Sequence, residues 1–197
     1  MEFIEKKTGY DYSLKIMLLG EASVGKTIFC DRLVFSNDIN HFNFLKSNCL
    51  STIGIDLSFS LIKYKEKIFQ LKICDFAGWG NCYESNKALI KGSVAVLLFY
   101  NAFYRHSFNK AKDLYETYFP INKDAVFILV RSKYEVNLDP VIKNKYFVSD
   151  EEALEYINDK NNFYFAHISS FEKYETGIKN LIEIILFYYL KNKNKFE

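Results

Sequence analysis

Short apolar runs alternate along the chain with longer stretches in which apolar residues recur at helical spacing. Apolar runs bounded by polar residues predict buried strands, whereas recurrence at i, i+3 and i+4 predicts helices that bury one face. The predicted strands are 14–19, 57–64, 67–74, 93–100, 125–130 and 162–167. The predicted helices are 26–35, 86–91, 108–118, 150–158 and 177–191.

Alternation of strands with helices predicts an α/β fold in three layers, with a mostly parallel six-stranded sheet and helices on both of its faces. The strands 57–64 and 67–74 flank the short turn Lys65-Glu66, which predicts a hairpin and hence one antiparallel edge strand. We expect a single domain over 1–197, with a short N-terminal extension over about 1–12 and a short tail over about 191–197.

Two serines are placed to cap helices at their N-termini. Ser107 precedes the predicted helix 108–118, and Ser149 precedes the predicted helix 150–158. Glu152 follows Ser149 at the spacing of a capping box. We therefore expect both serine side chains to accept hydrogen bonds from the first turn of their helices.

Composition excludes several classes of protein. The net charge of +2 provides no electrostatic basis for binding nucleic acid. Hydrophobic residues make up 49% of the chain and only two prolines occur, which argues against global disorder. The four cysteines have irregular spacings, so we expect reduced thiols in a cytoplasmic protein rather than a disulfide framework or a metal site. No apolar run is long enough to predict a transmembrane segment.

Residues 20–27 read Gly-Glu-Ala-Ser-Val-Gly-Lys-Thr and match G-x-x-x-x-G-K-[ST], between a predicted strand and a predicted helix. Glycines in such a loop let main-chain N–H groups surround an anion, and the helix N-terminus adds partial positive charge. Lys26 would reach the β- and γ-phosphates of a nucleotide, and Thr27 would offer its hydroxyl to Mg²⁺. The alternative is a strand–helix turn that matches by chance. The expected nucleotide contacts are Glu21, Ala22, Ser23, Val24, Gly25, Lys26, Thr27 and Ile28.

Two further motifs carry candidate chemistry. Asp75 ends the strand 67–74 and could hold Mg²⁺ through a water, and Gly78 could bring its N–H close to a γ-phosphate. Thr52, just before the hairpin, is a candidate second hydroxyl on Mg²⁺. Each also has a purely structural interpretation: a strand-ending Asp, a turn Gly and a strand-flanking Thr.

Together these blocks give the chain a resemblance to the Ras superfamily of small GTPases, and within it to the Rab branch. Residues 20–27 resemble the phosphate loop, 52–56 (Thr-Ile-Gly-Ile-Asp) the Rab switch I signature, and 71–78 the strand and the entry to switch II. Lys91-Gly92, Tyr100-Asn101 and Ser107-Phe108 are similar to further family positions at matching separations. The resemblance covers almost the whole chain and implies the Ras-like P-loop GTPase fold.

The resemblance also implies a nucleotide switch that binds GTP or GDP with Mg²⁺. Lys26 and Gly78 would take catalytic positions, and Thr27, Thr52 and Asp75 would hold the metal. Switch I (about 36–56) and switch II (about 75–91) would contact effectors, exchange factors and GTPase-activating proteins. We expect a monomer that acts in the cytoplasm and transiently at endomembranes, and the printed sequence shows no prenylation motif.

One departure from the family pattern concerns hydrolysis. Trp79 occupies the catalytic position where the family usually carries Gln, which orients the attacking water. An indole has one N–H donor and no acceptor, so it cannot both accept from and direct a water. We therefore expect slow or absent intrinsic hydrolysis. The alternative is that Trp79 packs in a partner-facing surface and that another group serves the water.

A second departure concerns recognition of the base. Residues 132–135 read Ser-Lys-Tyr-Glu where the family has Asn-Lys-x-Asp, and 169–171 read Ser-Ser-Phe where it has Ser-Ala-Lys. The expected base contacts are Lys133, Glu135, Ser169, Ser170 and Phe171. Each lost hydrogen bond weakens binding by about 0.5–1.5 kcal/mol, so we expect reduced guanine selectivity. Two rival interpretations are a pseudo-GTPase scaffold and a P-loop NTPase with another base preference.

Overall fold

The computed structural model describes residues 1–3, 9–34, 52–78, 83–133, 147–169 and 177–196. The strands are β1 (Glu2–Phe3), β2 (Tyr12–Gly20), β3 (Ile55–Tyr64), β4 (Lys67–Phe76), β5 (Ala95–Asn101), β6 (Val126–Lys133) and β7 (Phe163–Ser169). The helices are α1 (Lys26–Val34), α3 (Tyr83–Ile90), α4 (Arg105–Tyr118), α6 (Asp150–Ile157), α7 (Gly177–Lys191) and the 3-10 turn η1 (Lys193–Lys195). Every predicted strand and helix is therefore present, with ends that differ by up to about three residues.

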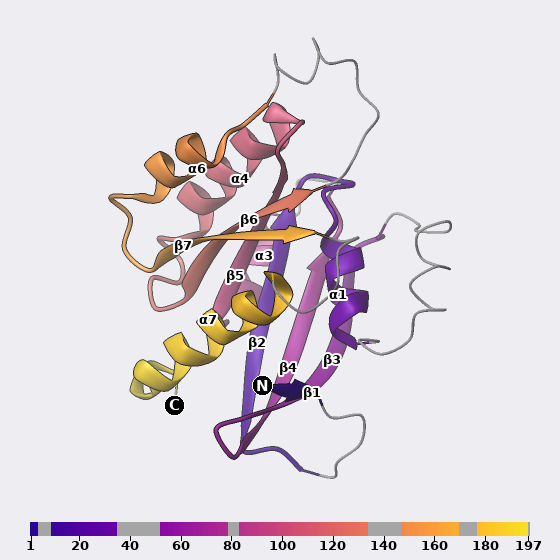
Figure 1. The fold of residues 1–197 in the computed structure, drawn as a ribbon, viewed down its shortest axis with the longest axis vertical. Helices are drawn as coiled ribbons and strands as arrows, with labels where there is room; N and C mark the ends of the chain where they lie inside the picture. The colour runs from indigo at the N-terminus through magenta and orange to yellow at the C-terminus, as the bar shows by residue number, and fades with distance from the viewer. Residues whose placement is uncertain (4–8, 35–51, 79–82, 134–146, 170–176, 197) are drawn as a thin grey trace.

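Within the described ranges the strands form one sheet in the order β1-β3-β4-β2-β5-β6-β7 (Figure 1). Strands β4, β2, β5, β6 and β7 are parallel, and β3 is antiparallel to β4. The sheet thus has seven strands rather than the predicted six, because Glu2 and Phe3 pair antiparallel with Lys63 and Ile62 of β3. The expected N-terminal extension therefore supplies an edge strand, which two residues are too short to predict by periodicity.

The sheet separates two hydrophobic clusters, as its predicted burial on both faces requires. Helices α1 and α7 pack against one face, where Phe29 and Leu33 join Leu181 and Ile185. Helices α3, α4 and α6 contribute to the cluster on the other face. Figure 1 shows α7 and α1 in front of the strands that they cover. The result is the predicted three-layer α/β architecture.

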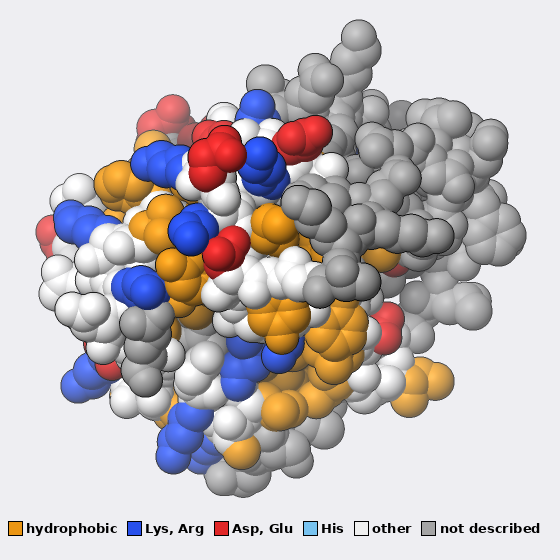
Figure 2. Space-filling view, turned by 90° about the horizontal axis from the view of Figure 1, so that it is seen from below, with side chains coloured by type: hydrophobic (Ala, Val, Ile, Leu, Met, Phe, Trp, Pro, Cys, Tyr) orange, Lys and Arg blue, Asp and Glu red, His pale blue; other side chains and the backbone are white. Residues whose placement is uncertain are grey.

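Charged side chains are mixed on the surface. In the view of Figure 2, Lys and Arg side chains lie among Asp, Glu and hydrophobic side chains, so the described residues on this face form no patch of a single charge. In the part of the chain that the structure describes, no helix combines the length and hydropathy needed to cross a membrane.

The serine at position 149 caps its helix, but the serine at position 107 does not. Ser149 Oγ accepts a hydrogen bond from the backbone N–H of Glu152 at 3.2 Å, as predicted. Helix α4 instead begins at Arg105, one turn before the predicted start. The buried Ser107 hydroxyl donates to Tyr104 O at 2.6 Å and accepts from the backbone N–H of Asn101 at 3.0 Å. It therefore connects the end of β5 to the first turn of α4.

The cysteines that the structure describes are free and buried. Cys30 lies on α1 and Cys74 on β4, and burial raises the pKa of the Cys30 thiol to about 12. Within the described residues no group of His, Cys, Asp and Glu side chains is arranged to hold a metal ion. Cys49 and Cys82 lie outside those residues.

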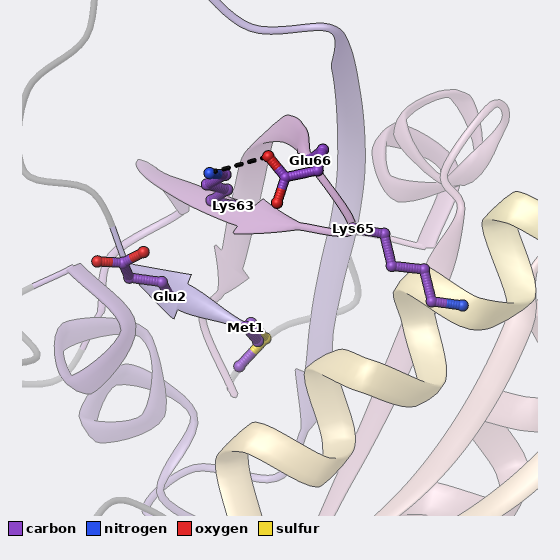
Figure 3. A pocket seen from close by; sticks show the side chains of 5 residues that line it. All are labelled: Met1, Glu2, Lys63, Lys65 and Glu66. Carbon is purple, nitrogen blue, oxygen red and sulfur yellow. Dashed lines mark ion pairs between the residues drawn. The ribbon is translucent and has the colours of Figure 1, made fainter.

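The predicted hairpin turns at Lys65 and Glu66, which have φ of 47° and 61°. Positive φ at both central residues is the geometry of a type I′ turn, which suits the twist of two antiparallel strands. Glu66 pairs with Lys63 at 3.2 Å beside Met1 and Glu2, where these side chains line a shallow pocket (Figure 3). The pair is largely exposed and contributes little to stability.

We expect Glu66→Gly to raise the free energy of unfolding by about 1 kcal/mol, because glycine removes the steric penalty of a left-handed conformation. Urea unfolding followed by circular dichroism measures this change. Glu66→Ala is the matched control, since it also removes the carboxylate but keeps the Cβ. An equal effect of the two substitutions would contradict the turn geometry.

Candidate nucleotide and metal site

The loop between β2 and α1 contains several residues with positive φ. Gly20 ends β2 with φ of 145°, and a Cβ on it would lie 2.5 Å from the carbonyl oxygen of Phe99. Only glycine permits this close approach of β2 to β5. Ser23, at the exposed tip of the loop, has φ of 61°, a conformation that non-glycine residues seldom adopt. Reversals of this kind turn successive main-chain N–H groups inward.

The Lys26 side chain lies under this loop and is only 5% exposed. Its Nζ donates to the carbonyl oxygens of Gly20 at 3.1 Å and of Glu21 at 2.8 Å. Burial lowers the pKa of the Lys26 ammonium, while the carboxylates of Asp75 and Glu21 act in the opposite direction. A buried cation is stabilised by nearby negative charge, which the phosphates of a nucleotide would add to that of the two carboxylates.

Three side-chain oxygens from three separate segments meet beside Lys26. Thr27 Oγ1 donates to Asp75 Oδ2 at 2.5 Å and lies 3.0 Å from Thr52 Oγ1. Thr52 Oγ1 also donates to Asp75 Oδ2, at 3.3 Å. The structure therefore brings together the three residues that the sequence predicts as metal ligands.

Asp75 lies at the centre of this cluster and is only 1% exposed. Burial raises the pKa of its carboxyl group, while the hydrogen bond from Thr27 and the charge of Lys26 act in the opposite direction. Its second oxygen, Oδ1, is buried and has no hydrogen-bond partner among the residues that the structure describes. A buried carboxylate oxygen beside two hydroxyls is a donor set that suits Mg²⁺, a hard cation that prefers oxygen. Thr27, Thr52 and Asp75 would hold the ion.

The register of the sheet explains how Asp75 and Thr52, which are far apart in the sequence, come to lie side by side. Asp75 lies opposite Leu18 of β2 on one side and opposite Asp56 of β3 on the other. Just beyond the paired strands, the backbone N–H of Ala77 donates to the carbonyl oxygen of Gly54 at 2.9 Å. This bond positions the segment that carries Thr52 next to the end of β4.

Gly78 packs directly against the phosphate loop. A Cβ at this position would overlap the backbone nitrogen of Ala22 and lie 2.6 Å from the carbonyl carbon of Glu21. Any other residue would have to displace main-chain atoms of the loop. Gly78, the predicted sensor of the γ-phosphate, is thus in contact with the loop that would hold the phosphates.

The expected base contacts lie at the same edge of the sheet, as far as the structure describes them. Lys133 ends β6 and pairs with Ser169 at the end of β7, so the two base-recognition segments start side by side. The buried Ser132 hydroxyl donates to the carbonyl oxygen of Tyr100 at 3.0 Å and is thereby engaged within the sheet. Trp79, Glu135, Ser170 and Phe171 lie outside the described residues.

The structure also contains contacts that the sequence does not predict. His106 Nδ1 of α4 lies 3.2 Å from Glu21 Oε2 of the phosphate loop. Arg105, its neighbour, forms two hydrogen bonds with the carboxylate of Glu152 at 2.6 and 2.9 Å. Neither pair has a sequence signal, because the partners belong to separate elements and match no motif.

Comparison with known proteins agrees with this geometry. Residues 15–188 match the family model described as Ras family, and this range runs from within β2 to most of α7. The match includes the loop, Thr52 and Asp75.

Several Rab proteins are similar to the chain. Ras-related protein Rab-11B of Dictyostelium discoideum is 28% identical over 191 residues, which are 95% of this chain and 80% of that protein. RABA1h of Arabidopsis thaliana is 29% identical over 165 residues, 78% of this chain and 72% of its own length. Rab-8A of Bos taurus is 35% identical over 104 residues, and this match spans only about half of each protein (53% and 47%). Since the family match extends over most of the sequence, the chain belongs to the Ras family and is a divergent, Rab-like small GTPase.

Proposed function

We propose that the protein is a Mg²⁺-dependent switch that binds GTP and GDP in vesicle trafficking or signalling. The observation that supports this most directly is the meeting of Thr27, Thr52 and Asp75 oxygens beside the buried ammonium of Lys26. Each group matches one need of a metal–polyphosphate complex. The hydroxyls and the carboxylate provide hard oxygen ligands, and the ammonium provides positive charge for the phosphates.

The contacts of Thr52 suggest how the switch works. Bound Mg²⁺ would neutralise negative charge on the phosphates. Thr52 reaches the site through its hydroxyl, which contacts Thr27 and Asp75. When those contacts are lost, the segment before β3 is released, and the bond between Gly54 and Ala77 links this release to the end of β4. Loss of the contacts at the site would in this way affect the conformation of both expected switch regions.

Exposed apolar side chains support the proposal that partner proteins dock beside switch I. Ile53, Ile55, Leu57 and Phe59 occupy alternate positions along β3 and its approach, and they are 95%, 43%, 52% and 48% exposed. Alternate positions of a strand share one face, so these side chains form a continuous stripe. A contiguous exposed apolar surface is a feature of protein interaction sites. Effectors, exchange factors and GTPase-activating proteins are the proposed occupants.

We also propose that intrinsic hydrolysis is slow, because Trp79 lacks the acceptor that a water-orienting Gln provides. The second candidate is a pseudo-GTPase that binds partners without turnover. The hydrogen bond from the Ser132 hydroxyl to the carbonyl oxygen of Tyr100 favours it, since the hydroxyl proton is not free to be donated to a base. The buried Lys26 and the oxygen cluster favour retained nucleotide binding.

The nucleotide that accompanies the purified protein distinguishes these functions. We expect GDP on chromatography after denaturation, and we expect Lys26→Ala to lose it because the ammonium that faces the phosphates is removed. Lys179→Ala, on the exposed face of α7, is the matched control and should keep GDP. An empty wild-type protein would support the pseudo-GTPase, and an adenine nucleotide would support a different base preference.

Asp75→Asn tests whether the buried carboxylate binds a metal ion and, without that ion, destabilises the folded protein. Without metal and nucleotide, we expect the free energy of unfolding to rise by on the order of 1 kcal/mol, because the substitution removes a buried charge with an unpaired oxygen. With GDP and Mg²⁺, the wild type should gain stability by mass action and the variant should gain far less. Thermal unfolding in both conditions measures the two effects.

The control for that experiment is Asp56→Asn, which removes the exposed carboxylate opposite Asp75 on β3. It should leave the stabilisation by GDP and Mg²⁺ intact. If Asp75→Asn responds to GDP and Mg²⁺ as the wild type does, Asp75 is not part of the metal site.

Single-turnover cleavage of GTP tests the role of Trp79. We expect Trp79→Gln to accelerate cleavage on the order of 10- to 100-fold, because the amide both accepts from and donates to the attacking water. Trp79→Leu removes the indole without providing an amide, and its rate should stay at the wild-type level. Equal rates for wild type and Trp79→Gln would mean that another group already orients the water.

A further inference from the structure

We infer that His106 is a positioning residue for the phosphate loop, and that its charge sets how fast bound nucleotide is released. This inference rests on the proposed nucleotide binding and adds a regulation of the same site. When the imidazole is protonated, its ion pair with Glu21 holds the loop. When the imidazole is neutral, the loop opens more readily.

The geometry of the pair supports this role. His106 lies in the first turn of α4, and its Nδ1 is 3.2 Å from Glu21 Oε2. The Glu21 side chain is only 18% exposed, whereas that of His106 is 67% exposed. The carboxylate is therefore held within the loop region, while the imidazole remains accessible to protons from solvent. The Tyr104 ring lies 5.7 Å from the imidazole at an angle of 33° and supports it from the helix N-terminus.

Glu21 belongs to the part of the loop where the other site contacts converge. Its carbonyl oxygen accepts the hydrogen bond from Lys26 Nζ at 2.8 Å. The peptide that joins it to Ala22 is also the surface against which Gly78 packs. A displacement of Glu21 would therefore disturb both the position of Lys26 and the packing of Gly78 against the loop. This is why a single surface pair can influence retention of the nucleotide.

Other charged groups around the pair do not replace His106. On the loop, Lys26 acts electrostatically on Glu21 but donates its hydrogen bonds to main-chain oxygens. On α4, the guanidinium of Arg105 is engaged by Glu152 and by the carbonyl oxygen of Phe147.

The remaining charged groups of these elements lie further along α4 and at the end of β4. Lys110 lies one turn after His106 on α4 and has interactions of its own. From β4, Asp75 acts electrostatically on Lys26. In the part of the chain that the structure describes, His106 is thus the basic side chain that lies within ion-pair distance of the Glu21 carboxylate.

The direction of the pH effect follows from the charges of the two partners. Imidazole side chains change charge between about pH 5 and 8, whereas a glutamate stays ionised over this range. A charge-assisted hydrogen bond is about twice as strong as a neutral one. The pair is therefore stronger at the acidic end of the range than at the basic end. Release of nucleotide should accelerate as pH rises.

The test measures dissociation of a fluorescent GDP analogue from the full chain, chased by excess GDP at constant Mg²⁺, between about pH 5.5 and 8.5. We expect the wild-type rate to rise about twofold to fivefold across this range. His106→Gln keeps a hydrogen-bond donor without the charge, and its rate should be independent of pH and equal to the fast wild-type limit. His106→Lys keeps a permanent cation, and its rate should stay near the slow limit.

His167→Gln is the matched control, since it removes an exposed imidazole of β7 and should keep the wild-type profile. Circular dichroism melting checks that each variant is folded, and His106→Lys alone tests the inference should His106→Gln not fold. A wild-type rate that does not vary with pH, or a His106→Gln profile that still varies as the wild type does, overturns this inference alone. Failure of the wild type to bind GDP overturns both this inference and the proposed function.

Discussion

The hydrogen bond from Thr27 to Asp75, 2.5 Å long, joins the first turn of α1 to the end of β4 at the centre of the site. Its acceptor is almost fully buried, and burial of a carboxylate is unfavourable unless cations or donors compensate for it. Thr27, Thr52 and Lys26 provide part of that compensation in the protein alone. Burial still raises the pKa of the carboxyl group, and one of its oxygens remains unpaired. A cation bound as proposed would therefore stabilise the site further.

The apolar part of the fold holds these polar groups in place. Strands β2, β4 and β5 are parallel neighbours, and most of their side chains are inaccessible to solvent. Parallel strands bring their carboxyl ends to one edge, where the loop after β2 and Asp75 of β4 meet. The polar groups there are positioned by close packing on both faces of the sheet rather than by their own interactions, since packing resists displacement.

This chain departs from the family pattern at residues expected to contact the base and to orient the attacking water. The residues expected to contact the phosphates follow the pattern. The motif of residues 20–27 is complete, and its lysine and threonine make the contacts described above. Ser132, by contrast, directs its hydroxyl into the sheet, and Trp79 replaces the residue that orients a nucleophile. Affinity for a polyphosphate with Mg²⁺ and selectivity for guanine depend on different residues, so one can be retained while the other weakens.

The pattern of the sequence determined the elements, the three-layer architecture and the identity of the loop, because burial of each strand or helix leaves a local periodicity and because the loop motif is contiguous. It also predicted Thr27, Thr52 and Asp75 as one site, through the family resemblance. It missed β1, whose two residues show no period, and it placed the cap of α4 at Ser107 although the helix begins one turn earlier.

Only the tertiary structure decided which side chains meet across elements. The orphaned oxygen of Asp75, the engagement of Ser132 by Tyr100 and the pair between Glu21 and His106 all depend on strand register and helix placement. A linear sequence records how strongly each residue prefers to be buried. It does not record which distant residue a buried or half-buried polar group will find, because that follows from how the packed layers are arranged in space.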